Sequence, residues 1–269
     1  MKIRYQNSIP YRDYNEDGIY HDGKLYIVFD GATALYQQGN NKSSMASEMI
    51  DYLINEIRNT SFKDLDDLFY QLSIKAANNF NYRETETAKL PSASVAAVLI
   101  NNDYIHTYLL GDCRISYQKT DGKIVHLIND QRLVNLDNSV KKELKELMKK
   151  YSFSEARNMI NKQLIDNRNQ ANKENGYAVF MPSNYPMFYS GAKKRIKRDE
   201  VENIKIYSDG YYSARDTFNL YKNQDDLFKE EPKVVIEKIK DVAFSDKEIK
   251  KYPRFKIIDD ISIIELVKK

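Results

Sequence analysis

The sequence predicts an α+β fold in which helices cover antiparallel sheets. Short β-rich apolar runs follow one another along the chain, and helical patterns come in pairs, so a strict strand–helix–strand alternation is missing. Hydrophobic residues make up 42% and charged residues 30% of the 269 residues, which is typical of a globular protein. No internal repeat and no Pro/Gly/Ser-rich linker divides the chain, so we expect one domain over residues 1–269.

A hairpin and two helices are predicted in the first 80 residues. The apolar run 24–29 comes directly after the turn pair Asp22-Gly23, which indicates that two strands meet there. Over residues 44–57 and again over 65–80, apolar residues recur every three or four positions. That spacing places them on one face of a helix in each segment.

The next segment predicts four strands in an antiparallel meander. Their runs are SVAAVLI, YIHTYLL, RISYQ and KIVHLI, and turn residues such as Asn101-Asn102-Asp103 and Asp121-Gly122 separate neighbouring runs. A charged helical insertion is expected over about 136–176, beside the core. After it we expect a strand NIKIYS, helices over about 211–249, and a last strand ISIIELV.

Composition excludes several classes of function. The net charge of +3 is too small for a general attraction to nucleic acid or membrane surfaces, and we expect neither as a partner. One cysteine and three histidines leave little material for a zinc cluster, so a metal here would be held by oxygen. Because no apolar stretch reaches about 18 residues, we expect a cytoplasmic protein. The basic run at 193–198 is interpreted as a solvated loop.

Acidic residues follow several predicted strands at the point where each strand ends. They are Asp30, Asp112, Asp209 and Asp259, with Glu16-Asp17 ahead of the first hairpin. A single Asp-Gly pair is more often only a turn, but four such strand ends can line one cleft. Carboxylates crowded in one cleft repel one another unless cations lie between them. Hard oxygen ligands suit Mg²⁺ or Mn²⁺, so the sequence predicts a site for one of these metals.

The motifs also follow a known order along the chain. They are Arg12-x-x-x-Glu16-Asp17, Asp30-Gly31, the strand SVAAVLI, Gly111-Asp112-Cys113-Arg114, Ser208-Asp209-Gly210 and Asp259-Asp260-Ile261-Ser262. This order resembles the metal-dependent protein phosphatase 2C family, in its bacterial type, over about residues 12–267. The resemblance implies a four-layer αββα sandwich, in which two antiparallel sheets are flanked by helix pairs.

The resemblance also implies a site and a reaction. The metal-site residues would be Glu16, Asp17, Asp30, Gly31 through its carbonyl, Asp112, Asp209 and Asp259. They would hold two Mn²⁺ or Mg²⁺ ions, with a third, weaker ion at Asp112 and Asp209 as in some members. Arg12 would grip the substrate phosphate, and Arg12 and Asp30 are the expected catalytic residues. The segment 136–176 lies where the family carries a variable flap.

The implied activity is hydrolysis of phosphoserine and phosphothreonine in proteins by attack of a metal-bridging water. A phosphorylated protein is the expected substrate, with a cognate kinase as a further partner in signal transduction. Two alternatives stay open: a phosphatase-fold binding module with weakened turnover, and a phosphatase of small phosphorylated metabolites.

The loop after Gly31, Cys113 and the pair Asp259-Asp260 depart from the family pattern or need a choice, and the three histidines need an interpretation. Residues 32–35, beginning with Ala32, stand where eukaryotic members have a histidine proposed as general acid, so protonation of the leaving group is open. Cys113 replaces a more usual serine and is expected to be a small buried residue. Asp259 fits the last metal position better than Asp260. His106 and His126 are expected to be hydrogen-bonded structural residues, and His21 to be exposed.

Overall fold

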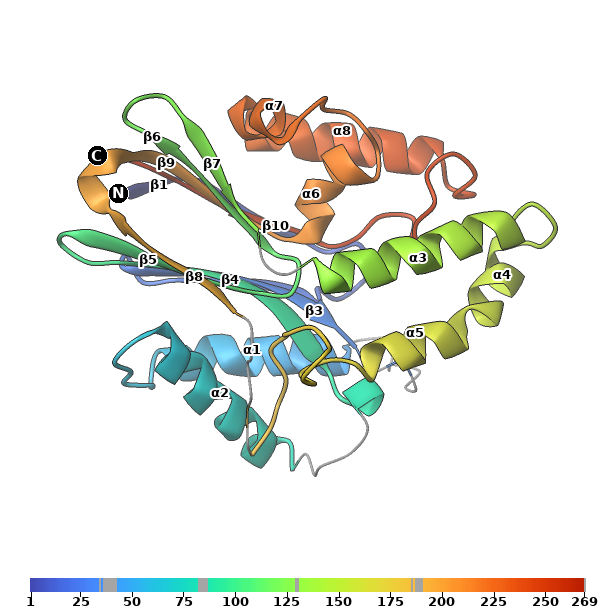
Figure 1. Cartoon of the computed structure of the whole chain (residues 1–269), viewed down its shortest axis with the longest axis horizontal. Helices are drawn as coiled ribbons and strands as arrows, with labels where there is room; N and C mark the ends of the chain where they lie inside the picture. Colours follow the sequence, from blue (N-terminus) through green and yellow to red (C-terminus); the bar gives the residue numbers. More distant parts are fainter. Residues whose placement is uncertain are drawn as a thin grey trace.

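Two antiparallel sheets packed face to face form the centre of the molecule, and helices cover the outer face of each sheet (Figure 1). The computed structural model describes residues 1–33, 35, 43–81, 87–128, 131–184, 186 and 191–268. This arrangement confirms the predicted α+β class and the four-layer αββα sandwich.

Each sheet has five strands within the described residues. The β3 sheet consists, in spatial order, of β2 (Asp17–His21), β3 (Leu25–Ala32), β4 (Ser92–Ile100), β5 (Tyr104–Leu110) and β8 (Ala192–Lys197). The β10 sheet consists of β1 (Lys2–Ile9), β10 (Ile261–Val267), β9 (Val201–Tyr207), β6 (Arg114–Lys119) and β7 (Ile124–Leu127).

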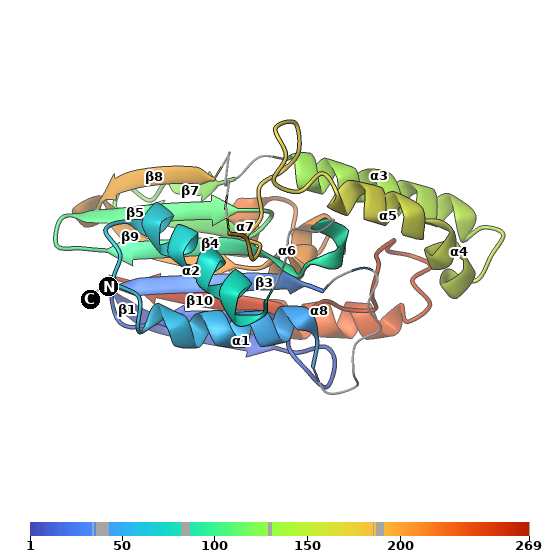
Figure 2. The ribbon, with the colours of Figure 1, turned by 90° about the horizontal axis from the view of Figure 1, so that it is seen from below.

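The helices form two covering layers and one group at the end of the sandwich (Figures 1 and 2). The β3 sheet is covered by α1 (Met45–Ile57) and α2 (Leu65–Asn79). The β10 sheet is covered by α6 (Asp209–Asp216), α7 (Gln224–Lys229) and α8 (Pro232–Ser245). At one end lie α3 (Arg132–Leu147), α4 (Phe153–Met159) and α5 (Asn161–Arg168), and the short 3₁₀ turns are Thr87–Lys89 and Arg198–Glu200.

The predicted elements of the first 80 residues are confirmed, and their ends have a local cause. Ser44 caps α1 because its hydroxyl oxygen accepts a hydrogen bond from the Ser47 N–H, and the Ser47 hydroxyl oxygen in turn accepts one from the Ser44 N–H. Asp64 caps α2 in the same way, by accepting from the Asp67 N–H at 2.9 Å. Both helices therefore start where a short polar side chain can satisfy a free backbone N–H.

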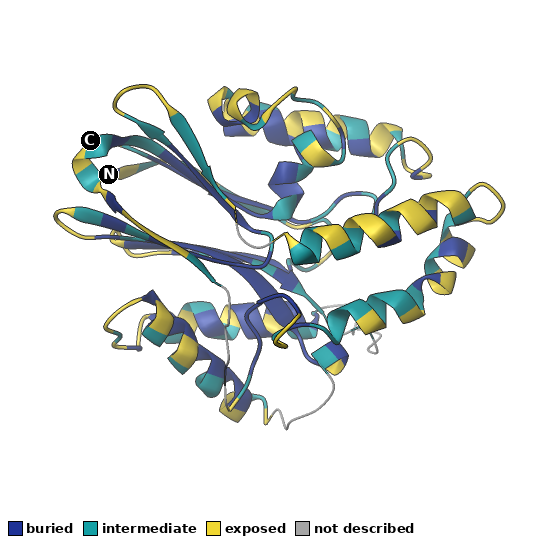
Figure 3. Ribbon diagram, in the orientation of Figure 1, coloured by how far each residue is buried: buried dark blue, intermediate teal, exposed yellow. Residues whose placement is uncertain are grey.

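The three main clusters of buried apolar residues form one layer between the sheets and one layer beneath the helices that cover each sheet (Figure 3). Val28, Ile115 and Ile264 belong to the layer between the sheets. Phe69 of α2 stacks on Tyr108 with ring centroids 5.0 Å apart, in the layer beneath α1 and α2. Because the β3 sheet is covered on both faces, its central strands read as continuous apolar runs.

The predicted meander over residues 94–128 is wrong, although its four strands exist. β4 pairs with β5 in the β3 sheet, whereas β6 pairs with β7 and β9 in the β10 sheet. The chain crosses between the sheets at Gly111, whose φ of +68° favours glycine. Apolar strands of the two sheets look alike in sequence, so their spacing alone does not show that a crossover separates them.

The sequence pattern did not predict two edge strands, β8 and β1. The first of them shows that the interpretation of the basic run as a loop is wrong. Residues 193–197 are part of β8, which pairs with β5, and are not a solvated loop. Four of these five side chains are exposed and only Ile196 is buried, so the usual apolar alternation is weak. Charged side chains on an edge strand hinder pairing with another chain. β1 likewise lies at an edge and alternates between exposed and half-buried positions.

The end of the sandwich with α3, α4 and α5 matches the helical insertion expected from the sequence. These helices extend beyond the sheets (Figure 2). The description of 136–176 as a variable flap, and of 1–269 as a single domain, stay predictions. None of the described helices combines the length and the apolar character needed to cross a membrane.

The crossover at Gly111 yields a prediction on stability. A Cβ at this position would lie 2.0 Å from the Ser94 hydroxyl oxygen and 3.0 Å from the Ser94 Cα. Gly111→Ala therefore combines a strained backbone with a clash and should lower the free energy of unfolding by about 3 kcal/mol.

The matched control is Gly122→Ala, in the β6–β7 turn. Gly122 has a similar φ of +86°, but a Cβ there meets nothing within 4 Å. Gly122→Ala should lower the free energy of unfolding by only about 1 kcal/mol. Urea unfolding of both variants measures the difference, and equal losses would show that the close packing on Ser94 is unimportant.

Candidate functional site

One end of the β3 sheet carries a row of polar side chains on neighbouring strands. Asp17 of β2 lies opposite Asp30 of β3, and Asp30 lies opposite Ser94 of β4. The Ser94 hydroxyl donates a hydrogen bond to Asp112 Oδ1 at 2.6 Å, and the Asp112 N–H donates to Ser94 Oγ at 3.2 Å. The pairing register thus brings three predicted acidic residues to one edge.

The β10 sheet supplies the opposite side of this edge. Asp209 is the first residue of α6, separated from β9 by Ser208 alone, and its backbone N–H donates to Asp30 Oδ2 at 3.2 Å. Ser208 and Ser262 tie the ends of β9 and β10 together through a Ser208 N–H to Ser262 carbonyl bond of 3.0 Å. The contact between Asp209 and Asp30 therefore joins the two sheets at the acidic edge.

Gly31 allows the chain before β2 to come close to this edge. A Cβ on Gly31 would lie 2.1 Å from the carbonyl oxygen of Glu16 and 2.7 Å from the side chain of Ile50. Only a residue without a side chain fits this approach. Glu16 and Asp17, both buried, thereby reach the same place as Asp30.

Burial and mutual repulsion raise the pKa values of three carboxyl groups in this cluster. Burial is the largest cause for Asp17, Asp30 and Asp209 alike. The next causes are the charges of Asp260 for Asp17, of Asp209 for Asp30 and of Asp112 for Asp209. Each group is thus pushed well above its ordinary pKa, as expected for carboxylates that share a site.

Two oxygens of the cluster have unmet hydrogen-bonding capacity. Glu16 Oε1 and Asp17 Oδ2 are buried and find no hydrogen-bond partner within the described part of the chain. Such atoms cost free energy unless something else contacts them. Carboxylate oxygens of this kind suit a hard divalent cation, but Glu16 and Asp17 are not among the described residues that line the adjoining pocket.

The structure distinguishes Asp259 from Asp260. Asp260 accepts backbone N–H groups on both oxygens, from Tyr11 at 2.6 Å and from Glu16 at 2.8 Å. Its carboxylate is therefore used to hold the chain before β2. Asp259 instead lines the pocket, and its Oδ1 accepts a hydrogen bond from Lys256 Nζ at 2.6 Å. The geometry favours Asp259 as the carboxylate that faces a ligand.

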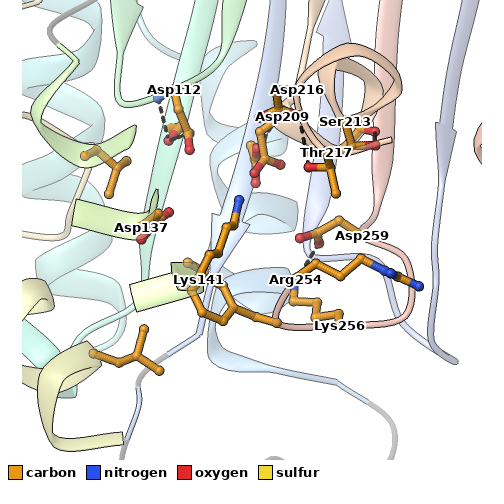
Figure 4. A pocket seen from close by; sticks show the side chains of 18 of the residues that line it. Asp112, Asp137, Lys141, Asp209, Ser213, Asp216, Thr217, Arg254, Lys256 and Asp259 are labelled. Atoms are coloured by element: carbon orange, nitrogen blue, oxygen red, sulfur yellow. Dashed lines mark hydrogen bonds and ion pairs between the residues drawn. The ribbon is translucent and has the colours of Figure 1, made fainter. Parts of the chain in front are cut away.

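A pocket opens between the acidic edge and the helical insertion (Figure 4). The sheets and α6 contribute Asp30, Asp112, Asp209 and Asp216, and the loop before β10 contributes Lys256 and Asp259. From the insertion come Asp137, Lys141 and Arg168. These three were missed in the sequence, since a charged helix does not show which of its many Lys, Arg and Asp residues face a cleft.

Lys141 is the cation that the insertion directs at the carboxylates. Figure 4 shows its side chain pointing toward Asp209. Burial alone would lower the pKa of Lys141, but the charges of the surrounding carboxylates, chiefly Asp216 and Asp209, together outweigh burial and raise it. Arg168 lies at the side of the pocket, where its Nη1 donates to Ser92 Oγ at 2.7 Å and to the Ala32 carbonyl at 3.4 Å.

Arg12 has a different position from the other predicted residues. Its side chain is exposed and donates from Nη1 to the Tyr14 hydroxyl at 2.9 Å. Its charge interacts with Glu16 and Asp260, so it lies beside the acidic cluster. It is not among the described residues that line the pocket.

The remaining candidates have structural surroundings. Cys113 is buried, and burial followed by the charge of Asp30 raises the pKa of its thiol. His126 is hydrogen-bonded to Ser116 at 2.8 Å and Asp225 at 2.7 Å, as expected of a structural histidine. His106 is half-buried, and its Nε2 is hydrogen-bonded to Asn101 Nδ2 at 3.3 Å; His21 is exposed. Of the loop 32–35, Ala34 lies outside the described residues.

The acidic cluster is crowded but is not arranged as a finished coordination shell. Within the described ranges, no group of three or more His, Cys, Asp and Glu side chains could hold one ion as they stand. Asp112 is turned to Ser94, and Asp259 to Lys256. Binding of a divalent ion therefore requires some of these side chains to reorient.

Several solved structures with this fold are bacterial phosphatases. The serine/threonine phosphatase Stp1 from Staphylococcus aureus has a TM-score of 0.53 at 12% identity, over 100% of this chain and 96% of that chain. The phosphatase PstP/Ppp of Mycobacterium tuberculosis has a TM-score of 0.55 at 12% identity, over 98% and 97%. The PstP catalytic domain in complex with two manganese ions gives 0.55 at 13%, over 98% and 96%. Identities this low show the fold alone.

The sequence itself carries the assignment to a family. No match was found among curated proteins. The family model for protein phosphatase 2C, however, matches residues 3–244, which is most of the chain. The motifs at Arg12, Asp30, Asp112 and Asp209 fall inside the matched region. The chain therefore belongs to the protein phosphatase 2C family.

Proposed function

We propose that this protein is a Mn²⁺- or Mg²⁺-dependent phosphatase that hydrolyses phosphoserine and phosphothreonine in proteins. One observation supports this most: Asp17, Asp30 and Asp209 are crowded where the two sheets meet, and their pKa values are raised. Such crowding is unfavourable without a bound cation. The family membership supports phosphate-ester hydrolysis as the chemistry.

The donor atoms fit a hard divalent cation. They are carboxylate and carbonyl oxygens, and two of them are buried without a partner. In this proposal the ions are held by Asp17, Asp30, the Gly31 carbonyl, Asp209 and Asp259, with Glu16 nearby and Asp112 at a weaker third position. Two such ions supply an activated water and withdraw charge from the phosphoryl group.

The chain's own residues bind the substrate and handle its proton. Arg12, at the edge of the cluster, gives up its hydrogen bond to the Tyr14 hydroxyl and binds the substrate phosphate with its guanidinium. Lys141 adds a positive charge from the insertion side of the pocket. Ala32 offers no proton to the leaving group. Asp137 lines the same pocket, and burial followed by the charge of Asp112 raises its pKa to about 6, which suits a proton donor near neutral pH.

The binding-module alternative also has an observation in its favour. The carboxylates are not set as a finished coordination shell within the described residues, so turnover could have been lost while recognition was kept. Hydrolysis of a phosphoserine peptide and a small phosphorylated metabolite, each with and without Mn²⁺, separates the possibilities. We expect the peptide to be the better substrate; binding without turnover would favour the module, and a preference for the metabolite would favour the third alternative.

The first prediction concerns metal and stability. In the metal-free protein, Asp30→Asn and Asp209→Asn should each raise the melting temperature, because a neutral amide relieves repulsion. Saturating Mn²⁺ should raise the melting temperature of the wild type by roughly 5 °C or more. Both variants should lose most of that rise, and p-nitrophenyl phosphate hydrolysis should fall by about 10²-fold or more.

Asp241→Asn is the control for this comparison. Asp241 is an exposed residue of α8, outside the pocket. Its variant should respond to Mn²⁺ as the wild type does. Should Asp30→Asn and Asp209→Asn respond normally as well, the assignment of the metal site is wrong.

The second prediction is a pH dependence of the metal-free protein. Its raised carboxyl pKa values, with Asp137 at about 6, lie above the ordinary value of about 3.9 in the unfolded chain. The folded state therefore binds more protons, and the free energy of unfolding falls as pH rises from about 4 through 6 and beyond.

Urea unfolding in EDTA between pH 5 and 8 measures this slope. Asp137→Asn should flatten this slope around pH 6. In a parallel series without EDTA, saturating Mn²⁺ should remove most of the remaining pH dependence. A metal-free protein that is most stable at pH 8 would contradict the crowding of charged carboxylates.

The third prediction separates phosphate binding from metal binding. Arg12→Ala should raise KM and the inhibition constant of inorganic phosphate by about tenfold, while Mn²⁺ affinity stays unchanged. Arg58→Ala is the control, because Arg58 is an exposed residue after α1. If Arg12→Ala has no effect and Lys141→Met raises both constants, the insertion holds the phosphate in place of Arg12.

A further inference from the structure

Lys256 joins two carboxylates of the acidic cluster that come from different parts of the chain. Its Nζ lies 2.6 Å from Asp259 Oδ1 and 3.9 Å from Glu16 Oε2. The Glu16 side chain is only 7% exposed, and the lysine side chain 30%. Figure 4 shows Lys256 beside Asp259 at the wall of the pocket. This is a partly buried ion pair, which solvent screens less than a surface pair.

The loop that carries Lys256 is held in place by Arg254. The Arg254 guanidinium is buried and pairs with Asp246 Oδ2 at 2.7 Å at the end of α8. It also donates to the carbonyls of Tyr252 at 2.7 Å and Ile257 at 2.8 Å. These bonds fix the backbone on both sides of Lys256, so the ammonium is directed at the acidic cluster rather than at solvent.

The charges around Lys256 explain why the ammonium stays there. The ammonium lies between two carboxylates, with Asp259 Oδ1 at 2.6 Å and Glu16 Oε2 at 3.9 Å, so its positive charge is matched by theirs. Without this cation, Asp259 and Glu16 would add to the repulsion already present at Asp17 and Asp30. Lys256 thus neutralises one side of the cluster in the metal-free protein.

We propose that Lys256 is a built-in counter-ion that competes with a divalent cation for Asp259 and Glu16. This inference rests on the metal site of the proposed function and adds a residue that sets the metal affinity. A lysine ammonium and a divalent cation cannot both contact one Asp259 oxygen without repulsion. Metal binding on this side therefore requires the lysine to leave its partners.

The consequence is a graded metal affinity within one cleft. On the side of Asp30 and Asp209, the described residues form no lysine ion pair with either carboxylate: Lys141 points toward Asp209 from across the pocket but is not paired with it. A cation on this side therefore meets a more distant positive charge and displaces no bound ammonium. On the side of Asp259, Lys256 must be displaced first. One ion should bind more weakly than the other, and removal of the lysine charge should strengthen the weaker one.

The test is isothermal titration of the full-length, metal-free protein with MnCl₂. Lys256→Gln should bind the weaker ion about tenfold more tightly than the wild type. Lys256→Arg, which keeps the charge, should bind as the wild type does. Lys238→Gln is the matched control, because Lys238 also pairs with a carboxylate, Glu230 at 2.9 Å, but lies outside the pocket.

Thermal unfolding gives a second readout that needs neither catalysis nor an ideal titration. In EDTA, Lys256→Gln should melt below the wild type, because a counter-ion is lost. In Mn²⁺ its gain in melting temperature should exceed that of the wild type. A variant that loses stability equally with and without Mn²⁺ would show a merely structural role and overturn the inference.

The outcomes separate this inference from the proposed function. Should Lys256→Gln bind Mn²⁺ no more tightly than the wild type while Asp30→Asn abolishes binding, the metal site stands and the role of Lys256 is refuted. Should neither the wild type nor Lys256→Gln bind Mn²⁺, the proposed metal dependence falls together with the inference.

Discussion

The rest of the site depends on the repulsion between carboxylates at the line where the two sheets meet. Asp17 and Asp30 belong to the β3 sheet, and Asp209 begins the helix that follows β9. The Asp209 N–H bond to Asp30 fixes this junction, while burial penalises the negative charges that it brings together. A fold that holds these groups in place stores unfavourable electrostatic energy, which a bound cation can release.

Positive side chains reduce this repulsion from two directions. Lys256 approaches from the loop before β10, and Lys141 from the insertion. Both keep their charge because the carboxylates outweigh the effect of burial on their pKa. The two lysines differ in their partners: Lys256 is paired with Asp259 at 2.6 Å, whereas Lys141 is directed across the pocket toward Asp209. The first is therefore suited to counter the cluster, and the second to meet a bound phosphate.

The sequence predicted the fold class and the acidic strand ends, because both leave local patterns. Apolar runs mark buried strands, and an Asp after such a run is visible without any knowledge of pairing. The crossover at Gly111 was missed because it depends on a partner strand far along the chain, β9. Lys141, Asp137 and Lys256 were missed because the direction of a charged side chain follows from tertiary packing. Arg12 was expected in the cleft, yet it contacts Tyr14 at the side of the cluster.

The central claim is that the junction of Asp30 and Asp209 is a metal site, and the most direct measurement is anomalous scattering from a crystal grown with MnCl₂. We expect manganese peaks in the pocket, with Asp30 among the nearest protein oxygens of the strongest peak and Lys256 turned away from Asp259. A well-ordered structure at saturating Mn²⁺ with no anomalous peak near Asp30, or with peaks only elsewhere on the molecule, would contradict the account.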